Sequence, residues 1–445
     1  MLAPFRGIRY ARDRVSGIAN VTSPPYDVIS GGSLEHLRAA DPHNVVRLIL
    51  PGEAAGGSQA AASLLREWLS AGVLIRDRVP ALYIYEQADA GSSWLQRGII
   101  GLVRLGSPES AGILPHEGVL PALVADRREL MAATQANLEP IFLIYDGEPA
   151  AGEAGTVPAM PGRAAAAPPA AGGTAAGVID TVAAERAPLV SIATEDGVRH
   201  RLWRLGDPGE QATIAGDLAG RRALIADGHH RYAAYQELQG EVRAAGQGAG
   251  PWDYGLAFLV DSDAYPPRVG AIHRVLPGLR PERAAELAKG GFTVQDLPTD
   301  FGLAEAQRCL AEAGRAGTAF LLAGGEPGVA FWLLSQPDPV QVAASMPAGV
   351  SVAWQGLDAS VLQQLLVGRI WGITDSLRDV LINHDAADAV RTASSLRATA
   401  VISNAPSFED VIQIAAHGER VPSKSTSFGP KPRTGLVLRT FGPSQ

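Results

Sequence analysis

The chain has 445 residues, which is enough for two or three domains of ordinary size. Its formal net charge is −8, which argues against a protein that binds nucleic acid through a basic face. A single cysteine excludes a disulfide framework and a cysteine-based zinc site. No apolar run reaches the ~18 residues of a membrane span, and the first eleven residues lack the apolar segment of a signal peptide. We therefore expect a cytoplasmic protein.

The first third of the chain alternates short apolar runs with stretches of helical periodicity. The runs predict strands, and the periodic stretches predict helices. The expected strands are Val45–Leu50, Ala81–Tyr85, Arg97–Leu105 and Pro140–Tyr145. The expected helices are Ser58–Leu69 and Leu130–Asn137.

Residues Glu148–Gly177 consist almost wholly of Ala, Gly and Pro. Such a segment buries too little side chain to offset its conformational entropy, and its prolines interrupt a helix. We expect a disordered surface insertion here. A binding lid is the alternative interpretation.

The alternation resumes after the insertion and predicts a mixed α/β fold, with helices packed on mixed sheets. A hairpin over Val190–Leu205 comes first, then the strand Ala223–Asp227 and a helix from Tyr232 to Leu238 that stops at Gly240. The later strands are Tyr254–Val260, Val269–Val275, Thr318–Leu322, Val329–Leu334 and Thr399–Ile402, and the later helices are Pro281–Ala288, Asp385–Leu396 and Phe408–His417. These patterns divide the chain into an N-terminal α/β region (1–147), the insertion (148–177), a central region (178–275) and a C-terminal α/β region (276–445).

The segment Asp227-Gly228-His229-His230-Arg231 carries the strongest chemical signal, because a strand here leads through one glycine into a helix. Gly228 permits a positive φ, and the N–H groups of a helix start attract anions. His229, His230 and Arg231 add donors for phosphate oxygens, and Asp227 could hold Mg²⁺ or accept a proton. The alternative is structural, with Asp227 as helix cap and Arg231 in an ion pair.

Three further segments, 116–127, 24–27 and 421–431, carry residues suited to catalysis or binding. His116 and Glu117, with Asp126 and Arg127 beyond them, could supply a general base, although alone they are typical of a loop with a surface ion pair. The prolines at 24 and 25 fix the direction of Tyr26 and Asp27. A buried Tyr26 beside a capping Asp27 explains that pattern equally well.

The segment 421–431 concentrates the cation that the chain otherwise avoids. Only three lysines occur, and two of them, Lys424 and Lys431, lie here with Ser425 and Thr426. A compact ammonium on a flexible stem suits phosphate, so we expect this loop to close over the Asp227–Arg231 turn. A solvated loop is the alternative.

Together these motifs resemble the domain of unknown function 1015 family of bacteria and archaea. The resemblance extends from Pro4-Phe5 to Gly435-Leu436, except in the insertion, and includes His273-Arg274. The 227–231 segment is also similar to the phosphate-binding signature of the ParB and sulfiredoxin superfamily, which includes free serine kinases. The resemblance implies a ParB-like core with additional N- and C-terminal α/β regions. The chain departs from the family pattern at Val119, Leu123, Val124 and Ile272, where a threonine, a proline-lysine pair and a second threonine are usual.

The resemblance implies a kinase that transfers phosphate from ATP, ADP or pyrophosphate, with Mg²⁺, to a free hydroxyl amino acid such as L-serine. Asp227 or Glu117 would accept the proton, with His230 in the catalytic group. Gly228, His229, His230, Arg231, Lys424, Ser425, Thr426 and Lys431 would bind phosphate, and Tyr26, Asp27, His116, Asp126, Arg127, His273 and Arg274 would support the substrate. Because of the departures, a nucleotide-binding regulatory protein without turnover is the second hypothesis. A ParB-like DNA-associated protein or nuclease ranks last, and the oligomeric state stays open.

Overall fold

The computed structural model describes residues 2–52, 56–89, 91, 94–106, 112–147, 174–324, 329–373, 380–422 and 424–441. These residues form two compact units. Unit 1 comprises Met1–Leu114, Val119–Pro267 and Pro430–Gln445, and unit 2 comprises Pro115–Gly118 and Arg268–Gly429. The segment 421–431 is therefore divided between them.

Unit 1 is built on a nine-stranded mixed sheet with the order β6-β11-β8-β12-β5-β4-β10-β9, with β1 added alongside β5. Its strands are β1 (Leu2–Ala3), β4 (Leu82–Asp89), β5 (Leu95–Arg104), β6 (Ile113–Leu114), β8 (Ile141–Tyr145), β9 (Val190–Ala193), β10 (Val198–Leu205), β11 (Ala223–Asp227) and β12 (Tyr254–Asp261). Strand β8 runs parallel to β12 and antiparallel to β11. The mixed α/β class expected from the sequence is confirmed.

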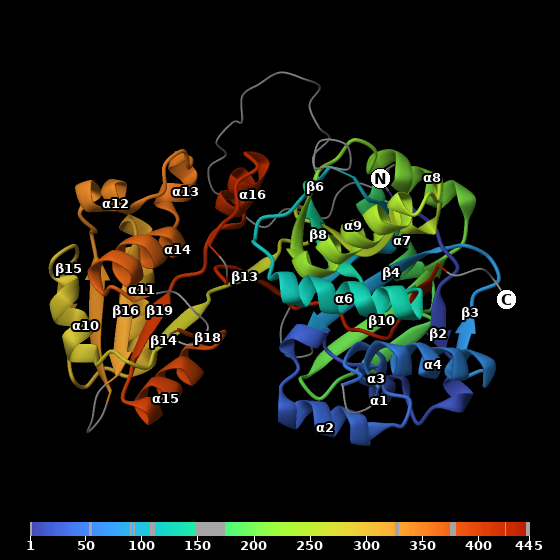
Figure 1. Cartoon of the computed structure of the whole chain (residues 1–445), viewed down its shortest axis with the longest axis horizontal. Helices are drawn as coiled ribbons and strands as arrows, with labels where there is room; N and C mark the ends of the chain where they lie inside the picture. Colours follow the sequence, from blue (N-terminus) through green and yellow to red (C-terminus); the bar gives the residue numbers. More distant parts are fainter. Residues whose placement is uncertain are drawn as a thin grey trace. The chain divides into compact units, whose positions relative to one another are not determined.

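The helices of unit 1 bury apolar faces against this sheet and against one another. Helix α6 packs on α4 and on α9 (Figure 1). The helices are α1 (Ile18–Val21), α2 (Gly31–Ala40), α3 (Val46–Ile49), α4 (Gly57–Ser70), α6 (Pro121–Thr134), α7 (Ala175–Glu185), α8 (Pro208–Asp217) and α9 (His229–Ala244), with short 3₁₀ turns at Arg12–Arg14, Tyr26–Val28 and Pro251–Asp253. Two small strand pairs, β2 (Ile8–Tyr10) with β3 (Leu74–Arg76) and β7 (Ala136–Asn137) with β21 (Arg439–Thr440), complete it.

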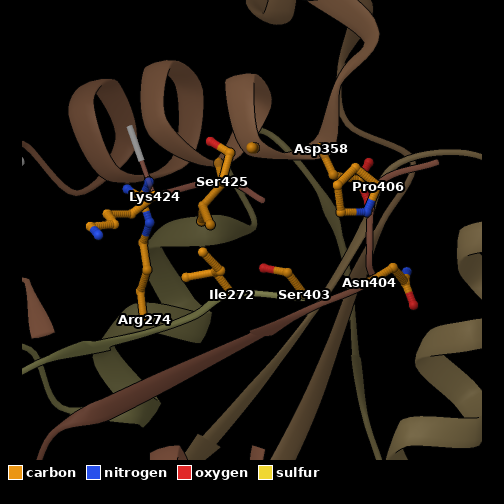
Figure 2. Close-up of a pocket in the computed structure, with 10 residues that line it drawn as sticks. Ile272, Arg274, Asp358, Ser403, Asn404, Pro406, Lys424 and Ser425 are labelled. Carbon is orange, nitrogen blue, oxygen red and sulfur yellow. The ribbon is translucent and has the colours of Figure 1, made fainter. Parts of the chain in front are cut away.

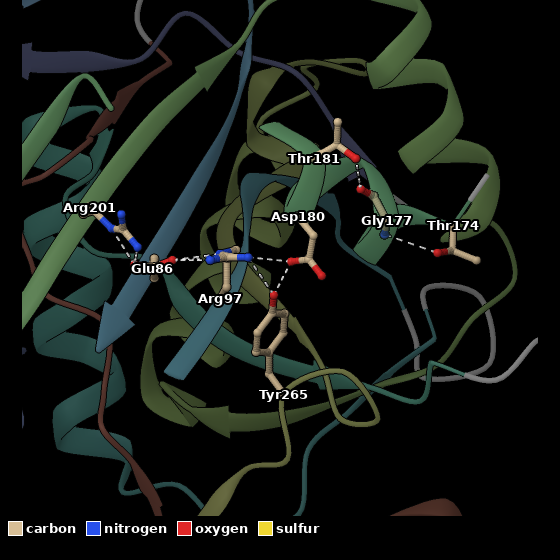
Figure 3. A network of polar contacts seen from close by, with 8 residues as sticks. All are labelled: Glu86, Arg97, Thr174, Gly177, Asp180, Thr181, Arg201 and Tyr265. Carbon is tan, nitrogen blue, oxygen red and sulfur yellow. Dashed lines mark hydrogen bonds and ion pairs between the residues drawn. The ribbon is translucent and has the colours of Figure 1, made fainter. Parts of the chain in front are cut away.

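A buried charge network holds α7 to this sheet (Figure 3). Glu86 on β4 is fully buried and accepts hydrogen bonds from Arg97 on β5 and Arg201 on β10. Arg97 also donates to Asp180 on α7 at 2.6 Å. Because a buried carboxylate is stable only when cations balance it, the three cross-strand side chains depend on one another.

Unit 2 has a six-stranded sheet with the order β15-β17-β16-β19-β14-β18 and a separate pair, β13 with β20. The strands are β13 (Arg268–Gly270), β14 (His273–Leu276), β15 (Thr293–Asp296), β16 (Ala319–Gly324), β17 (Ala330–Ser335), β18 (Leu381–Asn383), β19 (Thr399–Ser403) and β20 (Ser427–Gly429). The helices are α10 (Pro281–Ala288), α11 (Leu303–Ala316), α12 (Pro339–Ser345), α13 (Val352–Gly356), α14 (Asp358–Val361), a π-helix over Leu362–Ile370, α15 (Ala386–Leu396) and α16 (Phe408–Ala416).

Several predicted elements differ from the structure. Val45–Leu50 is not a strand: Val46–Ile49 forms α3, and a single helical turn in which Val46, Leu48 and Ile49 are all buried is too short to show helical periodicity. The helix expected over Leu130–Asn137 begins at Pro121, so Asp126 and Arg127 lie on α6 rather than in a loop. Helix α9 continues through Gly240 to Ala244, because its later turns pack on α6.

Two further predictions change at their boundaries. The single strand expected over Val269–Val275 is divided into β13 and β14, which pair with different partners. The predicted insertion falls outside the described residues over 148–173. Its last residues, Ala175–Gly177, form the first turn of α7, because Thr174 accepts a hydrogen bond from the Gly177 N–H and caps the helix.

Candidate functional site

The turn from β11 into α9 gives the site its local frame. Asp227 is the last residue of β11, and Gly228 adopts a φ of +95° before the helix begins at His229. Gly228 caps the helix without a side-chain hydrogen bond. The N-terminus of this 16-residue helix therefore directs its dipole toward the end of β11.

Lys431 connects this turn to the N-terminal segment. Its Nζ donates to Oδ1 of Asp227 at 2.6 Å and also to Oδ2 of Asp27. Burial lowers the pKa of Lys431, but the two carboxylates outweigh burial and the pKa is raised overall. We call Tyr26, Asp27, Asp227, Arg231 and Lys431 the Lys431 cluster; all five belong to unit 1.

The side chain of Arg231 is buried and holds the turn from within. Its Nη1 donates to the Pro140 carbonyl, and its Nη2 binds Oδ2 of Asp227. Nε has no hydrogen-bond partner among the described residues. A Cβ at position 228 would lie 3.1 Å from that Nε. A buried N–H donor thus lies beside Gly228 without an acceptor, at a helix start that favours anions.

Two arginine side chains pack near the ring of Tyr26. The guanidinium of Arg127 lies 4.4 Å from the centre of the Tyr26 ring, and that of Arg231 lies 5.9 Å from it. Burial raises the pKa of Tyr26 to about 12. Arg127 also pairs with Asp126, its neighbour on α6. The sequence-predicted residues Tyr26, Asp27, Arg127, Asp227, Arg231 and Lys431 are therefore brought together.

The two histidines of the motif have different surroundings. His229 is buried at the first position of α9. His230 is partly exposed, and its Nε2 accepts a hydrogen bond from the Leu120 N–H at 3.0 Å. This contact fixes the start of α6 to the start of α9 and requires a ring proton on Nδ1 if His230 is neutral.

Four residues that support the cluster were not predicted: Glu139, Thr434, Gln87 and Gln96. Glu139 is buried and accepts from the Tyr26 N–H and the Thr434 hydroxyl, both at 3.1 Å; burial raises its pKa. Gln87 and Gln96 donate to the carbonyl oxygens of Lys431 and Pro430. The one sequence signal is at Glu139, a charge separated by Pro140 from the buried strand β8. Gln87 lies on β4 and Gln96 on β5. The order of residues within these strands does not indicate which distant segment the glutamine side chains contact.

The remaining predicted residues belong to unit 2, where they form two groups. In the first, Nε2 of His116 lies 2.8 Å from the Thr426 hydroxyl, which donates to Oε1 of Glu117 at 2.9 Å. Since the hydroxyl has one proton, His116 is the donor to it. Thr426 is thus held between a donor and a carboxylate.

The second group surrounds a cavity of about 20 Å³, which has room for about one water molecule. Arg274, Lys424 and Ser425 line it together with Ile272, Asp358 and Ser403 (Figure 2). His273, next to Arg274 on β14, accepts from the Ser403 N–H. This cavity is too small for a nucleotide or an amino acid.

Within the described ranges, no group of three or more His, Cys, Asp or Glu side chains is placed to hold a metal ion. The same part of the chain contains no helix with the length and apolarity to cross a membrane.

Comparisons with known proteins identify a family and distant structural likenesses. A family model described as "Protein of unknown function (DUF1015)" matches residues 2–159 and 167–360. No curated protein sequence matches the chain. A free serine kinase in complex with AMP is similar at 16% identity and a TM-score of 0.35, over 74% of this chain and 87% of that chain. A conserved hypothetical protein from Pyrococcus furiosus (14%, TM-score 0.34, 74% and 90%) and a C-terminally truncated SbnI from Staphylococcus aureus (12%, 0.33, 75% and 84%) are also similar.

Proposed function

The chain belongs to this family of proteins of unknown function, and from that membership and the Lys431 cluster we propose that it is a small-molecule kinase. It would transfer phosphate from a nucleotide or pyrophosphate to the hydroxyl of a free amino acid, with L-serine as the expected acceptor. The observation that carries the proposal is the meeting of Asp27, Asp227 and Lys431 beside the Gly228 turn.

The phosphate of the nucleotide or pyrophosphate would bind beside Gly228, where the N-terminus of α9 lies next to Nε of Arg231. Phosphoryl transfer depends mainly on positioning and on neutralising charge. The start of α9 provides backbone N–H groups, and Nε of Arg231 is a buried donor without a described acceptor. These donors support the proposal that residues 227–231 bind phosphate. Lys431 adds a positive charge at the same turn.

A carboxylate of the cluster would accept the proton of the acceptor hydroxyl. In transfer, the hydroxyl oxygen forms a bond to phosphorus, the bond from phosphorus to the leaving phosphate oxygen breaks, and the hydroxyl proton moves to Asp227. Glu117 stays the alternative proton acceptor, since its Oε1 already accepts from a hydroxyl, that of Thr426.

The residues of the cluster are also suited to Mg²⁺. Protein-bound Mg²⁺ commonly uses one or two carboxylates and completes its shell with phosphate oxygens and water. Asp27 and Asp227 fit because both already reach one cation, the Lys431 ammonium. The ion would neutralise charge on the donor phosphates.

A regulatory protein that binds a nucleotide without turnover is the second candidate, and one observation favours it. At position 124, where the family usually has lysine, this chain has a valine that is buried in the core of unit 1. That position therefore supplies no charge to a ligand.

Binding and turnover tests separate these candidates. We expect ATP, ADP or pyrophosphate with Mg²⁺ to raise the melting temperature, and double-stranded DNA to leave it unchanged. Incubation with the stabilising donor and L-serine should then yield O-phosphoserine, and Asp227→Asn should abolish the yield while the protein stays folded. Stabilisation without phosphoserine would favour the regulatory protein, and stabilisation by DNA alone would contradict both.

A further inference from the structure

Unit 1 contains a second feature that the proposed phosphate chemistry leaves unused, a cavity of about 340 Å³. It lies between the α1–α2 region and the hairpin turn that joins β9 to β10. Its walls include Asn20, His36, Asn44, Glu195, Asp196 and Arg433. This volume is at the small end of the range for small-molecule sites.

Arg433 is a largely buried cation without an anionic partner. Its Nε donates to the Thr22 hydroxyl at 2.7 Å, and its Nη2 donates to the Ala19 and Thr22 carbonyls. No carboxylate of the described residues lies within ion-pair distance of it, and burial lowers its pKa. Two other guanidinium groups of unit 1 do have such partners: Arg97 pairs with Glu86 and Arg221 with Asp217.

The hydrogen bonds of Arg433 leave one nitrogen for a ligand. Nη1 makes no hydrogen bond to a described residue, whereas both Nη atoms of Arg439, another buried arginine, bind oxygens of the protein. A partly buried guanidinium that lines a cavity with an N–H pair free of protein partners is suited to a carboxylate or another small oxyanion.

The opposite wall has the opposite charge. Glu195 and Asp196 lie in the hairpin turn, and their charges act favourably on Arg433. Nε2 of His36 on α2 lies 3.3 Å from Glu195. Neither carboxylate forms an ion pair with Arg433. The cation and the two carboxylates therefore line the cavity at separate positions.

Hydrogen bonds fix Arg433 in place. Its backbone N–H donates to the hydroxyl of Tyr85, and that hydroxyl forms a hydrogen bond of 2.8 Å with Nδ1 of His200. Nε2 of His200 lies 3.1 Å from the Thr194 hydroxyl, in the same hairpin turn as Glu195. The cation and the acidic turn are therefore held by one chain of hydrogen bonds through the sheet.

We infer that this cavity binds a small zwitterion of the α-amino acid class, with its carboxylate on Arg433 and its ammonium on Glu195 and Asp196. The same two chain segments connect the cavity to the Lys431 cluster. Pro24 lines the cavity three residues before Asp27, and Arg433 follows Lys431 by two residues. The inference rests on the proposed function in one respect: it makes this ligand the phosphate acceptor.

Direct binding to the full-length chain tests the inference without turnover. Calorimetry should detect L-serine, and both 3-hydroxypropionate, which lacks the ammonium, and ethanolamine, which lacks the carboxylate, should bind at least tenfold more weakly. Arg433→Gln should weaken serine binding at least tenfold. The double variant Glu195→Gln/Asp196→Asn should reduce the preference for serine over 3-hydroxypropionate, and its exposed positions make misfolding a small risk. Arg199→Gln, an exposed change on β10, is the matched control and should change nothing.

The outcomes separate this inference from the proposed reaction. Serine binding that depends on these residues, without phosphoserine from any donor, supports the cavity and contradicts the kinase reaction. Phosphoserine formation with a KM for serine that is unchanged in the folded double variant and in Arg433→Gln keeps the reaction and overturns the cavity. Serine affinity equal to that of both analogues also overturns it.

Discussion

The ammonium of Lys431 binds the carboxylate of Asp27, which lies 404 residues earlier in the chain. The same ammonium binds Asp227, so one lysine joins three distant segments of unit 1. Without it, Asp227 would keep its ion pair with Arg231, but no lysine would link it to Asp27. The lysine therefore contributes to both the fold and the proposed site.

Lys431→Met should lower the free energy of unfolding by about 3 kcal/mol, because it removes the cation that the buried Asp227 shares with the partly buried Asp27. Chemical denaturation measures this change. Lys289→Met is the matched control, since Lys289 pairs with Glu286 on the exposed surface and its loss should leave stability unchanged. Equal stability of the two variants would show that the bridge to Asp27 and Asp227 contributes nothing.

Gly228→Ala should abolish the binding of pyrophosphate. An alanine Cβ would lie 3.1 Å from both Nε of Arg231 and Cγ2 of Ile141, and the φ of +95° adds strain of roughly 1–2 kcal/mol. Gly220→Ala is the control, because its φ is +78° and nothing lies within 4 Å of the added Cβ. Calorimetry with pyrophosphate on both variants separates the effect of crowding beside Arg231 from the effect of a strained backbone φ. Full affinity in Gly228→Ala would exclude this turn as the phosphate site.

Unit 1 should lose stability in mild acid because of His200. Burial, assisted by Arg433, lowers the pKa of His200 to about 4 from its usual 6.5. The folded state therefore favours the neutral ring: its full contribution is present above pH 6.5 and is lost as the pH falls through about 4. The difference amounts to about 3 kcal/mol. His200→Asn should flatten the stability profile between pH 6.5 and 4, whereas the exposed His417→Asn should not.

Asp358 should give unit 2 the opposite pH dependence. Burial raises its pKa to about 6. Since the folded state holds the proton more tightly than the unfolded chain, stability is greatest below about pH 4 and falls as the pH rises through about 6. Asp358→Asn should remove this decline, and hydrogen exchange of peptides from unit 2 measures it. An unchanged profile would mean that the carboxyl is ionised at pH 5 without cost.

Deleting residues 148–173 and joining the ends with a short linker should leave cooperative unfolding intact. Arg221 donates to the Asp146 carbonyl at 2.6 Å and to Asp217 at 2.7 Å, and Asp217 accepts from the Ala175 N–H. Both ends of the deleted segment are thus fixed by one ion pair. Retention of Thr174 keeps the cap of α7. Insoluble protein after this deletion would show that the segment contributes to folding.

Much of the candidate site could be predicted because its signals are local. The strand, glycine and helix around Gly228 lie next to one another, and the scarcity of lysine singled out Lys431. Glu139 could not be predicted as part of the site, since its partners Tyr26 and Thr434 lie at the two ends of the chain. The division at Gly429 also depends on packing, because Ser427–Gly429 pairs with β13 whereas Ser23 pairs with Thr434. Nothing in the sequence of that loop marks the change.

The return of the chain to unit 1 after Gly429 determines when the Lys431 cluster can form during synthesis. Ile8 pairs with Leu438 and Ser23 with Thr434, so residues 8–23 pair with residues 434–438. A ribosome that has completed residues 1–267 has made Asp27, Asp227 and the start of α9, but not their lysine. The whole of Arg268–Gly429 must be translated before Lys431 and Arg433 emerge. A nascent chain therefore has no complete site until Lys431 and Arg433 have been made.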